Sequence, residues 1–307
     1  MNRREFLLST ATVAARLKAS RSPDQSLTSE GWRIFEVKTH VHVQNASGMT
    51  RVWLPTPLVG APYQQTLGDT YVAENGRVVM VESDDLDLLF AEWTDGADPV
   101  LDLTSRVATR AYAVDLTKPT VAPPPDFSAF ARFLRPTKLY AIDGAVKTLA
   151  ADITRRAGTD IDRTRAILAW ILAHGGPNAA VECGLSNPQC ADRGQLCVGL
   201  ARSIGIPARV LFGLAVGAAD ATTAQRSRAE IYLVGFGWVP LDGSLGSFGS
   251  WDANWIAFNS AQDVVLPKAK HGTLPFFMHP QAETANGRAN GLEAATFRYD
   301  ITVREPA

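Results

Sequence analysis

Residues 186–209, SNPQCADRGQLCVGLARSIGIPAR, predict a helix with a cysteine in its first turn. Asn187 suits the N-cap, and Pro188 suits the first helical position, where a missing N–H costs nothing. Gly205 ends the helix. Cys190 would therefore lie among backbone N–H groups without helical partners, where the helix dipole favours the thiolate over the thiol. This pattern makes Cys190 a candidate nucleophile.

The other two cysteines, Cys183 and Cys197, stand seven residues to either side of Cys190. Cys197 falls in mid-helix, and we expect it to be a small buried hydrophobe. The spacing contains no C-x-x-C pair and no nearby histidine at zinc-ligand distance, so it predicts neither a metal nor another cofactor. In an oxidising compartment Cys183 and Cys190 could form a disulfide that silences the nucleophile. The sequence leaves that pairing open.

The composition is that of a globular protein with balanced charge. The chain has 307 residues, 46% of them hydrophobic, which is enough for two domains with large cores. Lys plus Arg number 30 against 31 for Asp plus Glu, so no basic field is available to attract nucleic acid. We therefore expect no nucleic-acid partner.

The chain opens with MNRREFLLSTATVAA, in which Arg3 and Arg4 precede a short apolar run. This resembles a twin-arginine export signal over residues 1–25 and predicts a periplasmic or secreted protein. The run is far shorter than the roughly 20 apolar residues that span a bilayer, so we expect no integral membrane segment. The alternative is an ordinary basic N-terminus.

Residues 30–117 predict an antiparallel β-domain. Residues 32–43 alternate apolar and polar side chains, as in a half-buried strand, and place His40 and His42 on the solvated side. Further strand-like runs follow at 51–54, 71–82, 88–93 and 99–112, with an Asn-Gly turn signal at 75–76. Residues 118–128, which contain KPTVAPPP, form a proline-rich linker that predicts a domain boundary.

Residues 129–307 predict a second domain of α+β class. Apolar residues recur at helical spacing from 149 to 172, ahead of the Cys190 helix. The period then returns to that of strands at 209–216, 228–233 and 237–242. Helices followed by such strands favour helices packed on an antiparallel sheet. The rest of the chain would form a C-terminal β extension.

The cysteine that opens the helix, the GIPARV that closes it and the later RAEIYLVGFGWVPLD closely resemble the core of the transglutaminase-like superfamily. The members of that superfamily are relatives of papain-like cysteine enzymes. The resemblance implies a cysteine that attacks a peptide or protein amide, a histidine base on the next core strand, and an acid on the strand after it. Cys190 and Asp242 match the first and last of these positions. Acyl transfer or peptide hydrolysis would follow from a complete set.

The middle position does not match, because counting back four residues from Glu230 in the family pattern H-x-x-A-E gives Arg226. An arginine stays charged and cannot take a proton from a thiol, although its charge could favour a thiolate. With Cys190, Arg226 and Asp242 as the site, we expect weak or absent activity on amides and a binding or scaffolding role in the cell envelope.

The first alternative is an active cysteine hydrolase or acyltransferase that forms a thioester on Cys190 with a relocated base. His174 and His279 are the candidates for that base. A second alternative is an unrelated two-domain structural protein with an incidental cysteine.

Overall fold

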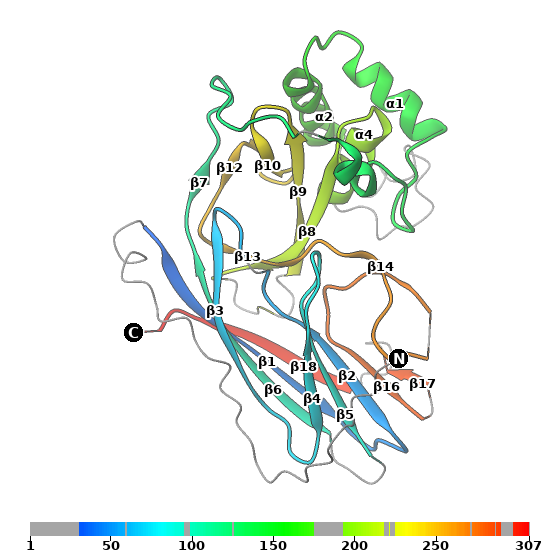
Figure 1. The fold of residues 1–307 in the computed structure, drawn as a ribbon. Helices are drawn as coiled ribbons and strands as arrows, with labels where there is room; N and C mark the ends of the chain where they lie inside the picture. The colour runs from blue at the N-terminus through cyan, green and yellow to red at the C-terminus, as the bar shows by residue number, and fades with distance from the viewer. Residues whose placement is uncertain are drawn as a thin grey trace, which may run out of the picture.

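The computed structural model describes residues 31–306 except 59, 95–98, 125, 175–192, 218–220, 222–224, 271, 286 and 290–296. A β-sandwich occupies one end of the molecule, and a sheet covered by helices occupies the other (Figure 1). The α+β class predicted from the sequence is confirmed.

The sandwich consists of two antiparallel sheets. The front sheet has the strand order β18-β1-β6-β3, and the back sheet has the order β17-β16-β2-β5-β4. The front strands are β1 (Arg33–Val43), β3 (Gln64–Val72), β6 (Val100–Thr109) and β18 (Phe297–Arg304). The back strands are β2 (Thr50–Pro55), β4 (Arg77–Val81), β5 (Leu88–Trp93), β16 (Gln281–Thr284) and β17 (Gly287–Ala289).

Strand β1 is half-buried, as its alternation predicts. Its buried side chains are Phe35, Val37, Thr39, Val41 and Val43. Val41 and Val43 pack in one cluster with Val52 and Leu89 of the back sheet, so the alternation sets which face of β1 meets the core.

The Asn-Gly turn at 75–76 joins two strands that do not pair with each other. Strand β3 belongs to the front sheet and β4 to the back sheet, so the turn carries the chain between the sheets. Trp93 fills the space under the turn, because a Cβ added to Gly76 would lie 2.7 Å from its ring. The ring N–H of Trp93 also donates to the Glu74 carbonyl at 2.9 Å.

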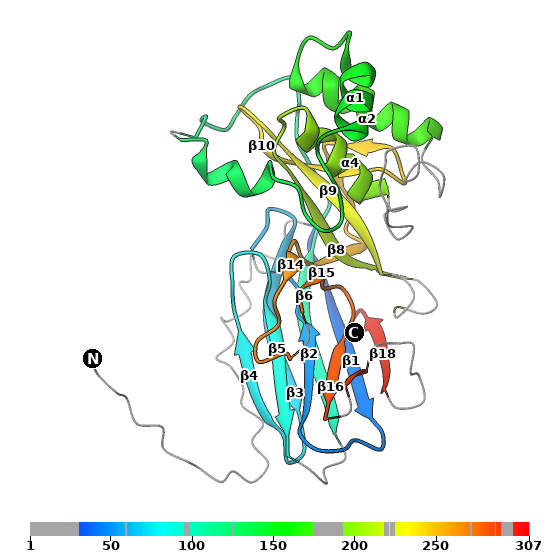
Figure 2. The ribbon, with the colours of Figure 1, turned by 90° about the vertical axis from the view of Figure 1, so that its right-hand side faces the viewer.

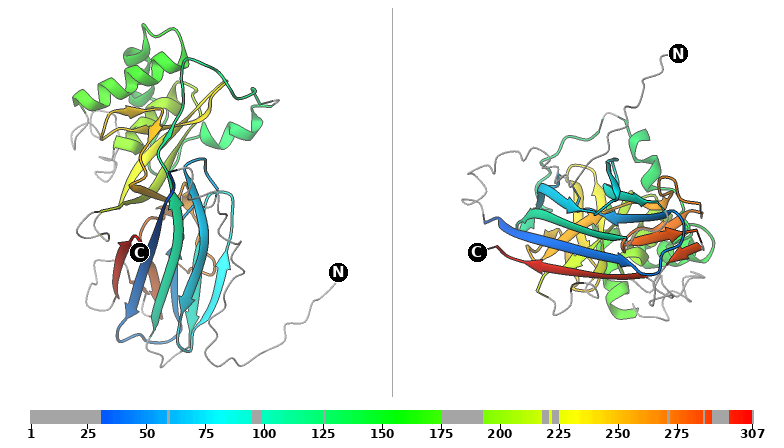
Figure 3. Two further views of the ribbon diagram at one scale, coloured as in Figure 1. Left: turned by 90° about the vertical axis from the view of Figure 1, so that its left-hand side faces the viewer. Right: turned by 90° about the horizontal axis from the view of Figure 1, so that it is seen from below.

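The last strands of the chain return to the first half of the molecule. Strand β18 pairs with β1 from Glu36↔Arg304 to Val43↔Phe297, and β16 pairs with β2. Figure 3, viewed from below, shows β18 and β1 lying side by side. The expected C-terminal β extension therefore completes the sandwich, and a single domain over 129–307 does not describe these strands.

The core at the other end has helices on one face of a five-stranded core sheet of order β11-β10-β9-β8-β13 (Figure 2). The helices are α1 (Ala145–Thr154), α2 (Asp160–His174) and α4 (Arg193–Ser203). The strands are β8 (Ala208–Ala215), β9 (Gln225–Leu233), β10 (Gly237–Asp242), β11 (Ser247–Phe248) and β13 (Trp255–Asn259). Val198, Val210 and Ile231 are fully buried between the two layers.

Short elements connect the two parts. They are β7 (Tyr112–Ala113) paired with β12 (Ser250–Trp251), the 3₁₀ helix η2 (Ser128–Phe133), and β14 (Gln262–Val264) paired with β15 (Leu274–Phe276). The described residues between Ala113 and Ser128 form neither helix nor strand. The linker lies against the core, because the N–H groups of Thr120 and Val121 both donate to the Gly235 carbonyl at 2.9 Å.

Candidate functional site

Of the three cysteines, the structure describes one. Cys183 and Cys190 lie outside the described residues, as does the predicted first turn of their helix. Cys197 lies within α4, is completely buried, and has its pKa raised to about 12 by burial. The expectation that Cys197 is a core side chain is confirmed, since a thiol in that state is neither accessible nor ionised at neutral pH.

The described start of α4 rests directly on β9 and on the end of β10. A Cβ added to Gly194 would lie 2.7 Å from Ser227 Oγ, and one added to Gly243 would lie 3.0 Å from Arg193 Cβ. Glycine at both positions therefore lets the helix and the two strands approach this closely. Strands β9 and β10 carry the other two predicted site residues, Arg226 and Asp242.

Asp242 is the last residue of β10 and is 8% exposed. Its Oδ1 accepts hydrogen bonds from the N–H groups of Ser244 at 2.8 Å and Leu245 at 3.1 Å. Its Oδ2 lies 2.8 Å from Nε of Arg228. Both carboxylate oxygens are thus engaged, one in the turn that follows β10 and one in an ion pair with β9.

Arg228 is the residue that the sequence reasoning missed. Its Nη2 lies 2.6 Å from Oδ2 of Asp252, and its guanidinium carbon lies 4.9 Å and 5.0 Å from the ring centroids of Trp251 and Trp255. The side chain is only 9% exposed. The available signal was strand alternation, which places residues 226 and 228 on the same face of β9.

Arg226 is exposed and lies opposite Gly213 of β8 in the ladder. The ladder between β9 and β10 ends at Leu241↔Ala229, so Asp242 comes next, beside Arg228. Arg226 is therefore the diagonal neighbour of Asp242 on that face.

Glu230, the glutamate of the RAEIY motif, is 2% exposed and contacts side chains from two other segments of the chain. Arg209 of β8 lies 2.6 Å from its carboxylate, and the hydroxyl of Tyr63 donates to it at 2.7 Å. Burial and the charge of Glu230 raise the pKa of Tyr63 well above its ordinary value. Arg209 also lies over the ring of Trp238 at 4.4 Å, so the partly buried Trp238 does not offer that face as a free stacking surface.

The segment that contains α4, the following strands and Asp242 matches a known protein family. Residues 147–243 match the transglutaminase-like superfamily. These residues form a transglutaminase-like core. They contain α4 together with β8, β9 and β10 through Gly243, so the match ends one residue after Asp242.

Similar proteins extend the likeness to the sandwich. An uncharacterized protein of Haemophilus influenzae is 26% identical over 331 residues, covering 85% of this chain and 88% of its own. The structure of a candidate cysteine protease from Cytophaga hutchinsonii superposes with a TM-score of 0.56 at 13% identity, covering 90% of this chain and 89% of that one. The periplasmic domain of TgpA from Pseudomonas aeruginosa gives a TM-score of 0.34 at 13% identity, covering 77% of this chain and 95% of that one. The superposition on the Cytophaga hutchinsonii structure shows that the fold is shared over most of both chains.

Three of the described histidines contact partners other than Asp242 of the transglutaminase-like core. His40 contacts Asp102 of the front sheet at 3.1 Å, and the ring of His174 stacks on Trp170 at 4.9 Å. His279 lies 3.3 Å from the hydroxyl of Tyr299, and burial lowers its pKa. His271 lies outside the described residues. The structure therefore brings neither His174 nor His279 to the predicted acid.

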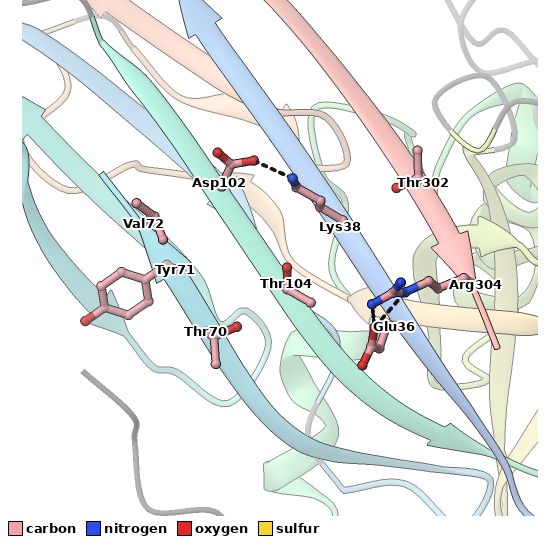
Figure 4. Close-up of a pocket in the computed structure, with 9 residues that line it drawn as sticks. All are labelled: Glu36, Lys38, Thr70, Tyr71, Val72, Asp102, Thr104, Thr302 and Arg304. Atoms are coloured by element: carbon pink, nitrogen blue, oxygen red, sulfur yellow. Dashed lines mark hydrogen bonds and ion pairs between the residues drawn. The ribbon is translucent and has the colours of Figure 1, made fainter. Parts of the chain in front are cut away.

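A pocket of about 570 Å³ lies on the front sheet of the sandwich rather than in the transglutaminase-like core (Figure 4). Its charged side chains neutralise one another, since Lys38 lies 3.1 Å from Asp102 and Arg304 donates to Glu36 at 2.7 Å. Neither cysteine nor histidine is among the described residues that line it. The pocket is thus a charge-balanced concavity of a solvated sheet face.

The described residues contain neither a metal-ligating cluster nor a membrane-spanning helix. Among them, no group of three or more His, Cys, Asp or Glu side chains could hold a metal ion. No helix within the same residues combines the length and hydrophobicity needed to cross a membrane.

Proposed function

We propose that this protein is an exported transglutaminase-like protein that has lost efficient amide chemistry and acts in the cell envelope as a binding or scaffolding protein. The observation that carries the proposal is the ion pair between Asp242 and Arg228, with Nε and Oδ2 2.8 Å apart. The acid that would orient a histidine base holds a guanidinium instead.

The chemistry of amide transfer explains why this matters. A cysteine must become a thiolate to attack, and the amine leaving group must receive a proton. Arg226 and Arg228 donate hydrogen bonds but do not exchange protons at neutral pH. A positioned acid–base group contributes about 10²–10⁴-fold to the rate, so its loss leaves little turnover.

The ligand class follows from the transglutaminase-like core. A transglutaminase-like core without the proton shuttle would bind a peptide or protein amide without cleaving it. The likeness to the candidate cysteine protease supports this ligand class through the shared fold.

Turnover of labelled amides tests the proposal. Wild type, Cys190→Ala and Cys183→Ala would be incubated with a casein substrate plus a fluorescent primary amine, and with fluorogenic peptides. We expect the three proteins to show the same background rate. A wild-type rate that disappears in Cys190→Ala but persists in Cys183→Ala would contradict the proposal and favour the active hydrolase or acyltransferase.

The envelope location has a separate test. The pair Arg3→Lys and Arg4→Lys should retain the protein inside a bacterial host that has a twin-arginine export pathway. Cell fractionation measures this directly. Equal export of wild type and variant would contradict the proposed signal.

A further inference from the structure

Arg228, the ion-pair partner of Asp242, lies on the face of the core sheet that points away from α4. Along β9 the side chains alternate, so Ser227 and Ala229 face α4 while Arg228 and Glu230 face the other way. Ser227 contacts the start of α4, and Ala229 belongs to the helix-covered cluster. Arg228 instead lies with Asp242 and against the rings of Trp251 and Trp255.

The surroundings of Arg228 hold it in one position. The two tryptophans meet edge to face with their centroids 4.9 Å apart, and the guanidinium lies about equally far from both rings. Two carboxylates bind different nitrogens of the same fork, Asp242 at Nε and Asp252 at Nη2. Charge-assisted hydrogen bonds and cation–π contacts of this kind strengthen where water is excluded.

We propose that Arg228 is a positioning residue that withholds Asp242 from whatever side chain occupies position 226. The inference rests on the proposed function and deepens it, because the loss of catalytic activity then has two causes. Position 226 lacks a base, and the acid that would orient a base is already bound by its nearer neighbour on β9.

The geometry makes this competition direct. Residue 228 is the cross-strand neighbour of Asp242, while residue 226 is its diagonal neighbour, about 7–8 Å away between Cα atoms. A histidine at 226 could reach the carboxylate, but only in competition with a permanent cation that already packs against two rings. A histidine alone should therefore remain unpaired.

The test reads the ionisation of an introduced histidine by long-range ¹H–¹⁵N NMR across a pH titration. Three variants of the full chain are compared: Arg226→His, Arg226→His with Arg228→Met, and Arg226→His with Asp252→Asn. Methionine retains the apolar contact with the tryptophans but carries no donor. The Asp252 variant is the matched control, because it perturbs the same guanidinium while leaving it bound to Asp242.

We expect the introduced imidazole in Arg226→His to titrate at or below its ordinary pKa of about 6.5, since the Asp242 carboxylate is already paired with Arg228. With Arg228→Met added, the pKa should rise by about one unit or more, because a free carboxylate now faces the imidazole. The Asp252→Asn control should titrate like Arg226→His alone.

A raised pKa already present in Arg226→His would overturn the inference, and so would no rise on adding Arg228→Met. Should the methionine variant fail to fold, Arg228→Lys takes its place, since a lysine holds two carboxylates less well than the guanidinium fork. A partial rise would then support the inference, and an unchanged pKa would overturn it. These titrations need no turnover, so they are independent of any Cys190-dependent rate in the wild type.

Discussion

At the scale of single residues, the behaviour of Asp242 follows from its burial and its partners. The side chains of Asp242 and Arg228 are 11% and 9% exposed, whereas that of Asp252 is 43% exposed. A charge removed from water needs a partner, because desolvation is otherwise uncompensated. Asp242 and Arg228 should therefore contribute more to stability than the exposed end of the same ion-pair network.

Asp242→Asn tests this difference. The substitution should lower the free energy of unfolding by about 1.5–3 kcal/mol, as for other hydrogen bonds to charged groups. Asp252→Asn, the control, should cost less than about 1 kcal/mol because its carboxylate is solvated. Urea denaturation measures both, and equal losses in the two variants would contradict this account.

Cys197 should not react with alkylating reagents in the folded protein. Its thiol is fully buried, and its pKa is raised to about 12. Iodoacetamide at pH 8 should therefore leave Cys197 unmodified until urea is added, with modification read by peptide mass spectrometry. Rapid labelling of Cys197 without denaturant would contradict the buried position.

At the scale of elements, the core sheet depends on close contact between β8 and β13. A Cβ added to Gly213 would lie 2.0 Å from the Ile256 carbonyl oxygen and 2.7 Å from the Trp255 ring. The first of these atoms is backbone and cannot rotate away. The two strands can approach this closely only because residue 213 is glycine.

Gly213→Ala should destabilise the protein by at least about 1–3 kcal/mol, the usual range for overpacking. Gly158→Ala is the matched control, because a Cβ there meets nothing within 4 Å and its φ is not in the left-handed region. The control should be neutral or slightly stabilising. Thermal unfolding of the two variants compares them, and a Gly213→Ala protein as stable as the control would refute the argument.

At the scale of the whole molecule, the sandwich and the core share buried side chains. Ile301 of β18 lies in one cluster with Phe35 and Val107 of the sandwich and with Leu214 and Ile256 of the core sheet. Ile301 is 3% exposed. The last strand of the chain therefore closes the front sheet and contributes to the contact between the two parts.

Ile301→Ala should cost about 2–5 kcal/mol, as for other large-to-small changes in a core. Because the cluster spans both parts, near-UV and far-UV circular dichroism should report a single unfolding transition. Thr302→Ala on the exposed face of the same strand is the control and should be nearly neutral. Unfolding of the sandwich alone in the Ile301 variant would contradict the shared cluster.

The contact of Tyr63 with Glu230 predicts a loss of stability at alkaline pH. The pKa of Tyr63 is raised well above 10.0, so the folded state keeps a proton that the unfolded state loses. The stability contributed is fully present below the unfolded pKa of about 10 and is lost as pH rises above it. Tyr63→Phe should flatten the fall of unfolding free energy above about pH 10, measured by urea denaturation. An equally steep fall in the variant would contradict the assignment.

Local chemistry allowed much of this fold to be predicted from the sequence. Alternation in β1 and the Gly205 stop of α4 depend on neighbouring residues only, and both appear in the structure. The family motif likewise identified Arg226 and Asp242 on adjacent strands.

Other features depend on residues far apart in the chain, which no local pattern reports. The pairing of β18 with β1 joins residues more than 250 positions apart, and the hydrogen bond of Tyr63 to Glu230 joins residues 167 positions apart. Arg228 binds Asp242 because of strand register, which follows from how the whole sheet packs. The sequence by itself determined the main helices and strands and placed Arg226 and Asp242 on adjacent strands, whereas tertiary packing alone decided which arginine holds the acid.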